Sequence, residues 1–189
     1  MAIKKPQQII TDTEAVYGYL KGTAKWAKVL EPDDYGKYSI NVYPEKEDLD
    51  KHVTMFESII ASAKSEVEDK DKKVVGLADA VKEDDEGKEF FSFKLPAEGY
   101  NGTMNKIDIY DASGKKVDDW DRLVGNGSTV KVKFQARPYY MNSTKMVGVS
   151  LKFYAVQVIN LVEYSAKGDS GFGDETGGSN VPFDTDDEF

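Results

Sequence analysis

The sequence has no cysteine and a single histidine, His52, so several kinds of chemistry are absent from it. Without thiols there is no disulfide, no thiolate metal ligand and no cysteine nucleophile. A lone histidine inside an expected helix, with no partner for acid or base catalysis, is more often structural than catalytic. We therefore expect a protein that is not an enzyme and has no catalytic residue, no metal site and no cofactor.

Long apolar runs are also missing. No stretch approaches the roughly 20 apolar residues that a membrane span needs, and the first residues, MAIKKPQQII, lack the apolar run of a secretion signal. We expect a cytoplasmic protein without a membrane partner.

The formal net charge of -9 conceals a basic body. Residues 163–189 hold eight acids against one lysine, and residues 66–89 hold ten acids against five lysines. The rest of the chain holds 16 acids and 19 bases and has a net charge of +3. Because phosphate binding depends on Lys and Arg, this body has the charge expected of a nucleic-acid binder, although the whole chain does not.

Short runs of β-branched and aromatic residues predict a mainly β domain over residues 1–164. A hairpin is expected from residues 23–30 and 37–43, and four further strands from residue 89 onward. Between them, apolar residues at spacings of three and four predict one α-helix over about residues 46–65. Five to six strands with one inserted helix fit an OB-fold, the small barrel that binds oligonucleotides, better than a sandwich.

Two segments differ in composition from this domain. Residues 66–89 are highly charged and weakly periodic, so we expect a surface insertion there. Residues 165–189 are rich in Gly, Ser, Asp and Thr, and they bury too little apolar surface to offset the entropy of ordering the backbone. We expect them to form a disordered acidic tail.

The strand expected at residues 128–140 carries the most informative pattern. Lys131, Lys133 and Arg137 alternate with apolar residues, which places cations on one face at a spacing of about 7 Å. This spacing suits the phosphates of an extended single strand. An amphipathic strand with a solvated basic face is the plainer alternative. A hairpin with the next strand would add Lys152 and Tyr154 to the same face, and a change of phase after Tyr154 predicts a bulge there.

Aromatic side chains among cations suit the binding of unpaired bases, because every base offers a face for stacking. The aromatics on strands could equally fill the core. Our candidate DNA-binding residues are Lys25, Tyr43, Lys94, Tyr100, Lys131, Lys133, Arg137, Tyr139, Lys152 and Tyr154.

The chain ends in PFDTDDEF, with four acids and a terminal aromatic. An anionic segment tethered to a cationic groove would compete with DNA, and a terminal Phe offers a partner protein an anchor. The expected partner-binding residues are Asp184, Asp186, Asp187, Glu188 and Phe189.

The blocks GNGSTVKVKFQARPYY and GVSLKFYAVQVINLVE, followed by the tail that ends in DTDDEF, resemble the single-stranded-DNA-binding proteins of tailed bacteriophages. This resemblance implies an OB-fold, preference for single over double strands, and work in phage DNA replication, recombination and repair in the host cytoplasm. It further implies that the tail contacts replication proteins such as DNA polymerase or helicase, and that the protein sometimes forms a homodimer.

Other functions remain open from the residues alone. A β-rich structural or interaction protein of a virion or scaffold would also show a basic strand and an acidic tail. A metal-dependent nuclease or a carbohydrate-binding module ranks lower, because the acid clusters lack the spacing of metal loops and no lectin pattern occurs.

Overall fold

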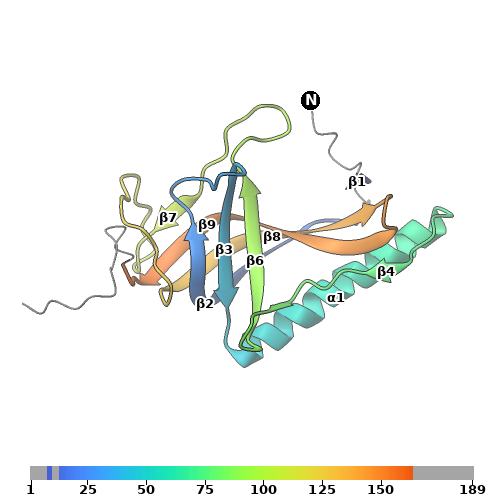
Figure 1. Cartoon of the computed structure of the whole chain (residues 1–189), viewed down its shortest axis with the longest axis horizontal. Coiled ribbons are helices and arrows are strands. Elements are labelled where there is room, and N and C mark those ends of the chain that lie inside the picture. The colour runs from blue at the N-terminus through green and yellow to red at the C-terminus, as the bar shows by residue number, and fades with distance from the viewer. Residues whose placement is uncertain (1–7, 10–12, 164–189) are drawn as a thin grey trace, which may run out of the picture.

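The computed structural model describes residues 8–9 and 13–163. Its main feature is a strongly curled sheet, with one long helix beside it (Figure 1). Five long strands form most of the sheet: β2 (Val16–Lys28), β3 (Lys37–Tyr43), β6 (Glu89–Pro96), β8 (Thr129–Met141) and β9 (Met146–Asn160). Four short strands flank them: β1 (Gln8–Ile9), β4 (Gly76–Leu77), β5 (Lys82–Glu83) and β7 (Asp108–Tyr110).

The sheet order is β4-β9-β8-β2-β3-β6-β5, with β1 on β8 and β7 parallel to β9. The long strand β2 pairs with β8 along its first part and with β3 along its last part, so that Thr23 is paired with both Tyr43 and Thr129. This sharing turns the sheet sharply. β6 then approaches β9, although no ladder joins the two in the described part of the chain. The expected mainly β OB-fold with one helix is confirmed.

The turn of the sheet depends on Gly22. A Cβ at this position would lie 2.5 Å from the carbonyl oxygen of Tyr43, which no side chain tolerates without a shift of the backbone. Gly18 plays a similar part, because its missing side chain leaves room for the Phe134 ring. The core is largely aromatic, and its largest fully buried side chains are Phe56, Phe91, Phe93, Phe134 and Phe153.

The expected hairpin between the two basic strands is confirmed as β8 and β9. Their register shifts between Lys133 and Phe134, where Ala155 and then Phe153 are the partners. Tyr154 is the extra residue at this point. The bulge expected at Tyr154 is therefore present, and it bends the strand around the barrel.

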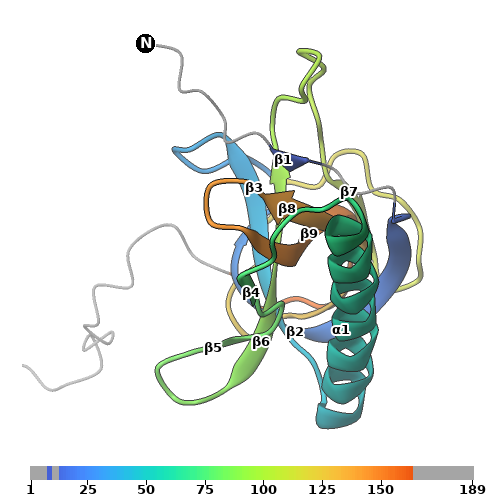
Figure 2. The ribbon, with the colours of Figure 1, turned by 90° about the vertical axis from the view of Figure 1, so that its right-hand side faces the viewer.

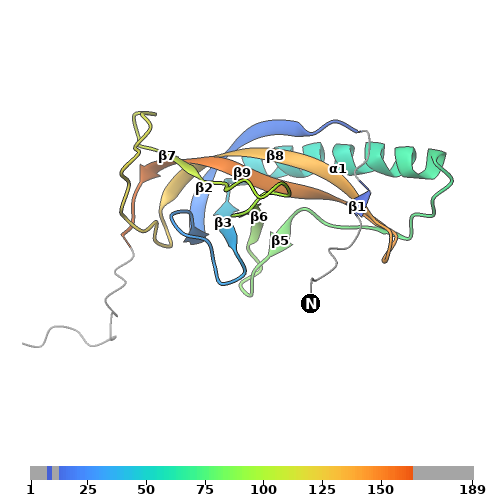
Figure 3. The ribbon, with the colours of Figure 1, turned by 90° about the horizontal axis from the view of Figure 1, so that it is seen from above.

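Helix α1 (Lys46–Asp69) runs alongside the β8–β9 hairpin (Figures 2 and 3). It buries one apolar stripe against the sheet and extends about one turn beyond the expected end. The reason is Val67, which packs in a small apolar cluster with Tyr140 and Val147. His52 is buried among aromatic rings, and its two ring nitrogens lie 2.7 Å and 3.2 Å from backbone carbonyl oxygens.

The charged segment 66–89 is attached to the sheet at two places. β4 pairs in parallel with β9, and β5 pairs antiparallel with β6. Between them, Ala80 and Val81 pack against the core. The acidic tail expected over residues 165–189 lies outside the described residues. Within the described residues, no helix is long and apolar enough to cross a membrane.

Candidate nucleic-acid interface

The side of the sheet turned away from the core carries cations and aromatic rings on neighbouring strands. Lys131 of β8 is paired with Lys21 of β2 and with Gln157 of β9, and Gln157 is paired with Tyr110 of β7. Paired residues point to the same face, so these four side chains form one row across the sheet.

The next rows continue the same surface. Lys133 is paired with Tyr19 and Ala155, Gln135 with Tyr17 and Lys152, and Arg137 with Ser150. We call the surface formed by these rows on β7, β9, β8 and β2 the outer face. Along β8 its polar side chains repeat about every 7 Å, as the alternation in the sequence requires.

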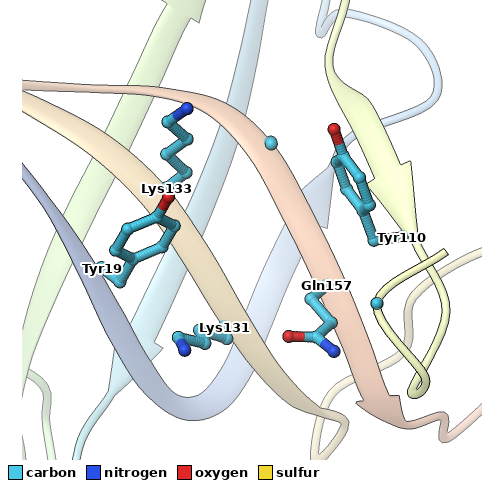
Figure 4. Close-up of a pocket in the computed structure, with 7 residues that line it drawn as sticks. Tyr19, Tyr110, Lys131, Lys133 and Gln157 are labelled. Atoms are coloured by element: carbon cyan, nitrogen blue, oxygen red, sulfur yellow. The ribbon is translucent and has the colours of Figure 1, made fainter. Parts of the chain in front are cut away.

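A hollow of about 250 Å³ lies at the centre of the outer face, lined by Lys131, Lys133 and Gln157 among others. Tyr19 and Tyr110 stand on opposite sides of it (Figure 4). The Lys131 ammonium lies 5.2 Å from the centre of the Tyr19 ring, in a cation-π contact. An aromatic ring and an ammonium group side by side can stack on a flat base and neutralise the phosphate attached to it.

The end wall of this hollow is a hydrogen-bonded turn at residues 111–115, which contributes Gly114 to the lining. The Asp111 carboxylate accepts hydrogen bonds from the backbone N–H groups of Ser113 and Lys115 and from the Ser113 hydroxyl, at 2.6–2.9 Å. The bond from the Ser113 hydroxyl is the largest cause that holds the pKa of Asp111 below its usual range. The Gln157 amide donates to the carbonyl of Ala112 in the same turn, which fixes the amide at the edge of the hollow.

Three side chains connect β9, β8 and β2 on the outer face. The Tyr154 hydroxyl donates to the side-chain oxygen of Gln135 at 3.0 Å, and the Gln135 amide donates to the Tyr17 hydroxyl at 2.8 Å. Partial burial raises the pKa of Tyr154. Because of these bonds both rings are fixed in orientation, and 65% of Tyr17 still remains exposed to solvent.

The part of the sheet formed by β2, β3 and β6 is arranged differently. Lys25 is paired with Asn41, and its ammonium lies 3.5 Å from the carboxylate of Asp84 in the turn between β5 and β6. The backbone N–H of Lys88 donates to Asp84 and is the largest cause that lowers the pKa of Asp84. An acidic residue of the charged segment thus forms an ion pair with one of the cations of this surface.

Tyr43, expected to stack on bases, does not lie free on the surface. Only 6% of it is exposed, because one side of its ring stacks on Phe90 with ring centres 5.0 Å apart. The Lys25 ammonium lies over the ring at 4.5 Å, and the hydroxyl donates to Asp84. Burial, followed by this hydrogen bond, raises the pKa of Tyr43 to about 12. We therefore correct its assignment: Tyr43 supports the Lys25 side chain and is not a stacking surface.

The other expected residues are divided among three places. Lys131, Lys133, Arg137, Lys152 and Tyr154 come together on the outer face. Tyr139 lies at its far end, with its ring over Gly148. Lys94 is exposed on β6, opposite Ser39 of β3, and is part of the β2–β3–β6 surface. Tyr100 is fully exposed in the loop after β6. This loop extends beyond the end of that strand (Figure 1).

Sequence reasoning missed part of the site. Tyr17, Tyr19 and Lys21 belong to the first half of β2, which we expected to begin only at residue 23. The alternation of VYGYLKG was the available signal, but two glycines obscured it. Tyr110 and Gln157 were also missed, because only the pairing of β7 with β9 shows that they are neighbours.

The expected partner-binding residues Asp184, Asp186, Asp187, Glu188 and Phe189 lie outside the described residues. Among the residues that are described, no group of three or more His, Asp or Glu side chains is placed to hold a metal ion.

No protein-family model and no curated protein matches the sequence. Solved structures with the same fold do match. One is gp2.5, a single-stranded DNA binding protein encoded by bacteriophage T7, with 23% sequence identity, 88% of this chain and 100% of that chain covered, and a TM-score of 0.63. Another is the single-stranded DNA-binding protein from bacteriophage Enc34, with 15% sequence identity, 90% of this chain and 95% of that chain covered, and a TM-score of 0.55. The resemblance drawn from the sequence is thus confirmed at the level of the fold.

Proposed function

We propose that this protein binds single-stranded DNA across the outer face and performs no chemistry on it. The observation that carries the proposal is the central hollow, where Lys131, Lys133 and the exposed Tyr19 ring come together from two paired strands. The ammonium groups would neutralise phosphates, and this supplies most of the affinity of such proteins. The ring would stack on one base, a contact worth about 1–3 kcal/mol.

The same geometry favours single strands over duplexes. Tyr17 and Tyr19 expose 65% and 57% of their surface, so their ring faces are available only to bases that are not paired and stacked within a helix. The Gln157 amide at the edge of the hollow has a donor and an acceptor, and it can bond to the edge of any base. We expect binding with little preference for sequence.

The test is a fluorescence anisotropy titration of the whole chain with a labelled oligo-dT at several salt concentrations. We expect binding that weakens as salt increases, and competition by unlabelled single strands but not by duplex DNA of the same length. Absence of binding at low salt, or equal competition by duplex, would refute the proposal. Retention on a glycan column in place of DNA binding would favour the carbohydrate-binding alternative.

For the tail we propose two activities, on the strength of its sequence. Its acids would compete with DNA for the cations of the outer face, and Phe189 with its carboxylate would recruit replication proteins such as DNA polymerase or helicase. Deleting residues 170–189 should tighten DNA binding and abolish recruitment. Unchanged affinity for DNA would show that the tail does not compete.

In the cell, we propose that the protein coats single-stranded DNA during phage DNA replication, recombination and repair, in some states as a homodimer. The sequence resemblance supports this setting, and so does the fold shared with gp2.5 of bacteriophage T7.

A further inference from the structure

Trp26 is the most unusual exposed residue of the described chain. It lies near the end of β2, where the alternation of the strand would turn its side chain inward. Yet 69% of its surface is exposed. Its backbone has a φ of 54°, in the left-handed region that bulky side chains rarely adopt. Strained backbone of this kind persists only where the surrounding structure imposes it, and such positions are frequent at binding sites.

The surrounding structure does impose this conformation. The backbone N–H of Trp26 donates to the side-chain oxygen of Asn126 at 2.8 Å. Two residues earlier, the carbonyl of Ala24 accepts from the N–H of Gly127, and the N–H of Ala24 donates to the carbonyl of Ser128. The turn before β8 therefore holds the β2 backbone in the bulge that exposes the Trp26 ring.

The ring adjoins a second hollow, of about 520 Å³, separate from the one at Tyr19. Its walls are residues 26–32 on one side and residues 121 and 123–126 on the other. Apolar side chains such as Leu30 and Leu123 contribute to the walls, as does Asn126. The hollow thus combines a large flat ring with polar groups at its edge, as a nucleobase requires.

Trp26 also lies beside lysines of the sheet. Its neighbour Lys25 is paired with Asn41, and Lys28 is paired with Ser39, which is paired in turn with Lys94. The two acids of the hollow, Glu31 and Asp121, belong to its loop walls. A single strand in this region would therefore place its phosphates over the lysines and turn a base toward the hollow.

We propose that Trp26 is a second base-stacking residue, and that Asn126 is the positioning residue that keeps its ring exposed. This inference rests on the proposed function and extends it: the DNA continues from the outer face along β2 to the second hollow. Trp26 lies seven residues after Tyr19 on β2, which would be about 23 Å in a straight extended strand and is less here, because β2 turns at Gly22. The bound DNA would then span several nucleotides between the two rings.

The two tryptophans allow a direct test. Trp120 is already engaged, since its ring N–H donates to the carbonyl of Arg122 and the Arg122 guanidinium lies 4.5 Å from the ring centre. In a Trp120→Phe variant, Trp26 is the only source of tryptophan emission. We expect oligo-dT to quench that emission. The quenching should follow the same binding curve as the rise in anisotropy of a labelled oligonucleotide. In the matched Trp26→Phe variant, where Trp120 remains, DNA should leave the emission nearly unchanged.

Affinity provides the second readout. Trp26→Ala should weaken binding of oligo-dT about 5- to 150-fold, the range expected for loss of one stacked base. Trp26→Phe should retain most of the affinity, because a flat ring remains. Asn126→Ala should reduce both affinity and quenching, because the ring is no longer held outward.

Two results would overturn the inference, and they differ from failure of the proposed function. One is normal DNA binding by anisotropy with unchanged Trp26 emission, and the other is an unchanged affinity of Trp26→Ala. Absence of binding by the parent chain would instead refute the proposed function itself.

Discussion

Lys25 of β2 and Asp84 of the β5–β6 turn form an ion pair across 3.5 Å, at the edge of the surface proposed to bind DNA. Asp84→Asn should release the lysine for a phosphate. The turn should survive, because an amide oxygen can still accept the N–H groups of Glu86 and Lys88 that the carboxylate accepts. We expect tighter binding of oligo-dT, with a slope of log K against log salt that is steeper by about 0.7.

The matched control is Asp85→Asn, which removes the same charge from an exposed neighbour that is not paired with Lys25. It should change affinity less than Asp84→Asn. Equal effects of the two variants would mean that net charge alone is responsible and that the ion pair does not restrain Lys25.

Tyr43 should titrate far above an ordinary tyrosine. Its pKa is raised from 10.0 to about 12, first by burial and then by the hydrogen bond to Asp84. Because the folded state favours the protonated phenol, this stabilisation is complete below pH 10 and is lost as the pH rises through 12. The phenolate absorbance of the parent and of Tyr43→Phe is followed as the pH is raised, and the difference between the two curves gives the pKa of Tyr43. Asp84→Asn should lower it, and a value near 10 in the parent would contradict the buried position.

Lys133 should contribute to affinity for every sequence alike. Lys133→Gln should weaken binding of all oligonucleotides and reduce the salt slope by about 0.7, the loss expected for one phosphate contact to a single strand. The control is Lys51→Gln, which removes an exposed cation from α1. Salt-dependent titrations compare the two. An equal loss in both variants would argue against a localised contact.

Gly22 should be required for stability. Gly22→Ala would place a Cβ 2.5 Å from the Tyr43 carbonyl oxygen and force β2 and β3 apart. We expect the free energy of unfolding to fall by about 1–3 kcal/mol, as for other overpacked sites, in urea denaturation. Gly76→Ala is the control, because its Cβ would meet only the Met146 side chain at 3.7 Å. Equal stability of the two variants would contradict the close approach of the strands.

The sequence predicted the β8–β9 hairpin, its outward cations and its bulge, because a period of two with charged and apolar residues in alternation leaves little choice of face. It also predicted α1, whose apolar residues recur at helical spacing. Both signals are local, so they can be read without knowing which strands are neighbours.

The rest of the site depends on contacts between distant segments. Tyr110 reaches the hollow only because the three-residue strand β7 pairs in parallel with β9. Tyr43 is buried only because Phe90 and the acidic turn at Asp84 lie over it. Trp26 is exposed only because Asn126, one hundred residues later, holds its backbone in the bulge. No local pattern contains such information.

Photocrosslinking tests the central claim most directly, because it reports both binding and the surface used. The full chain would be irradiated with a single-stranded oligonucleotide that contains 5-iodo-deoxyuridine, and the linked residues identified by mass spectrometry. We predict crosslinks to Tyr17 and Tyr19 of β2 and to Tyr110 of β7, reduced by increasing salt or by unlabelled single strands. Crosslinks confined to other surfaces, such as the loop at Tyr100 or the exposed side of α1, would contradict the account.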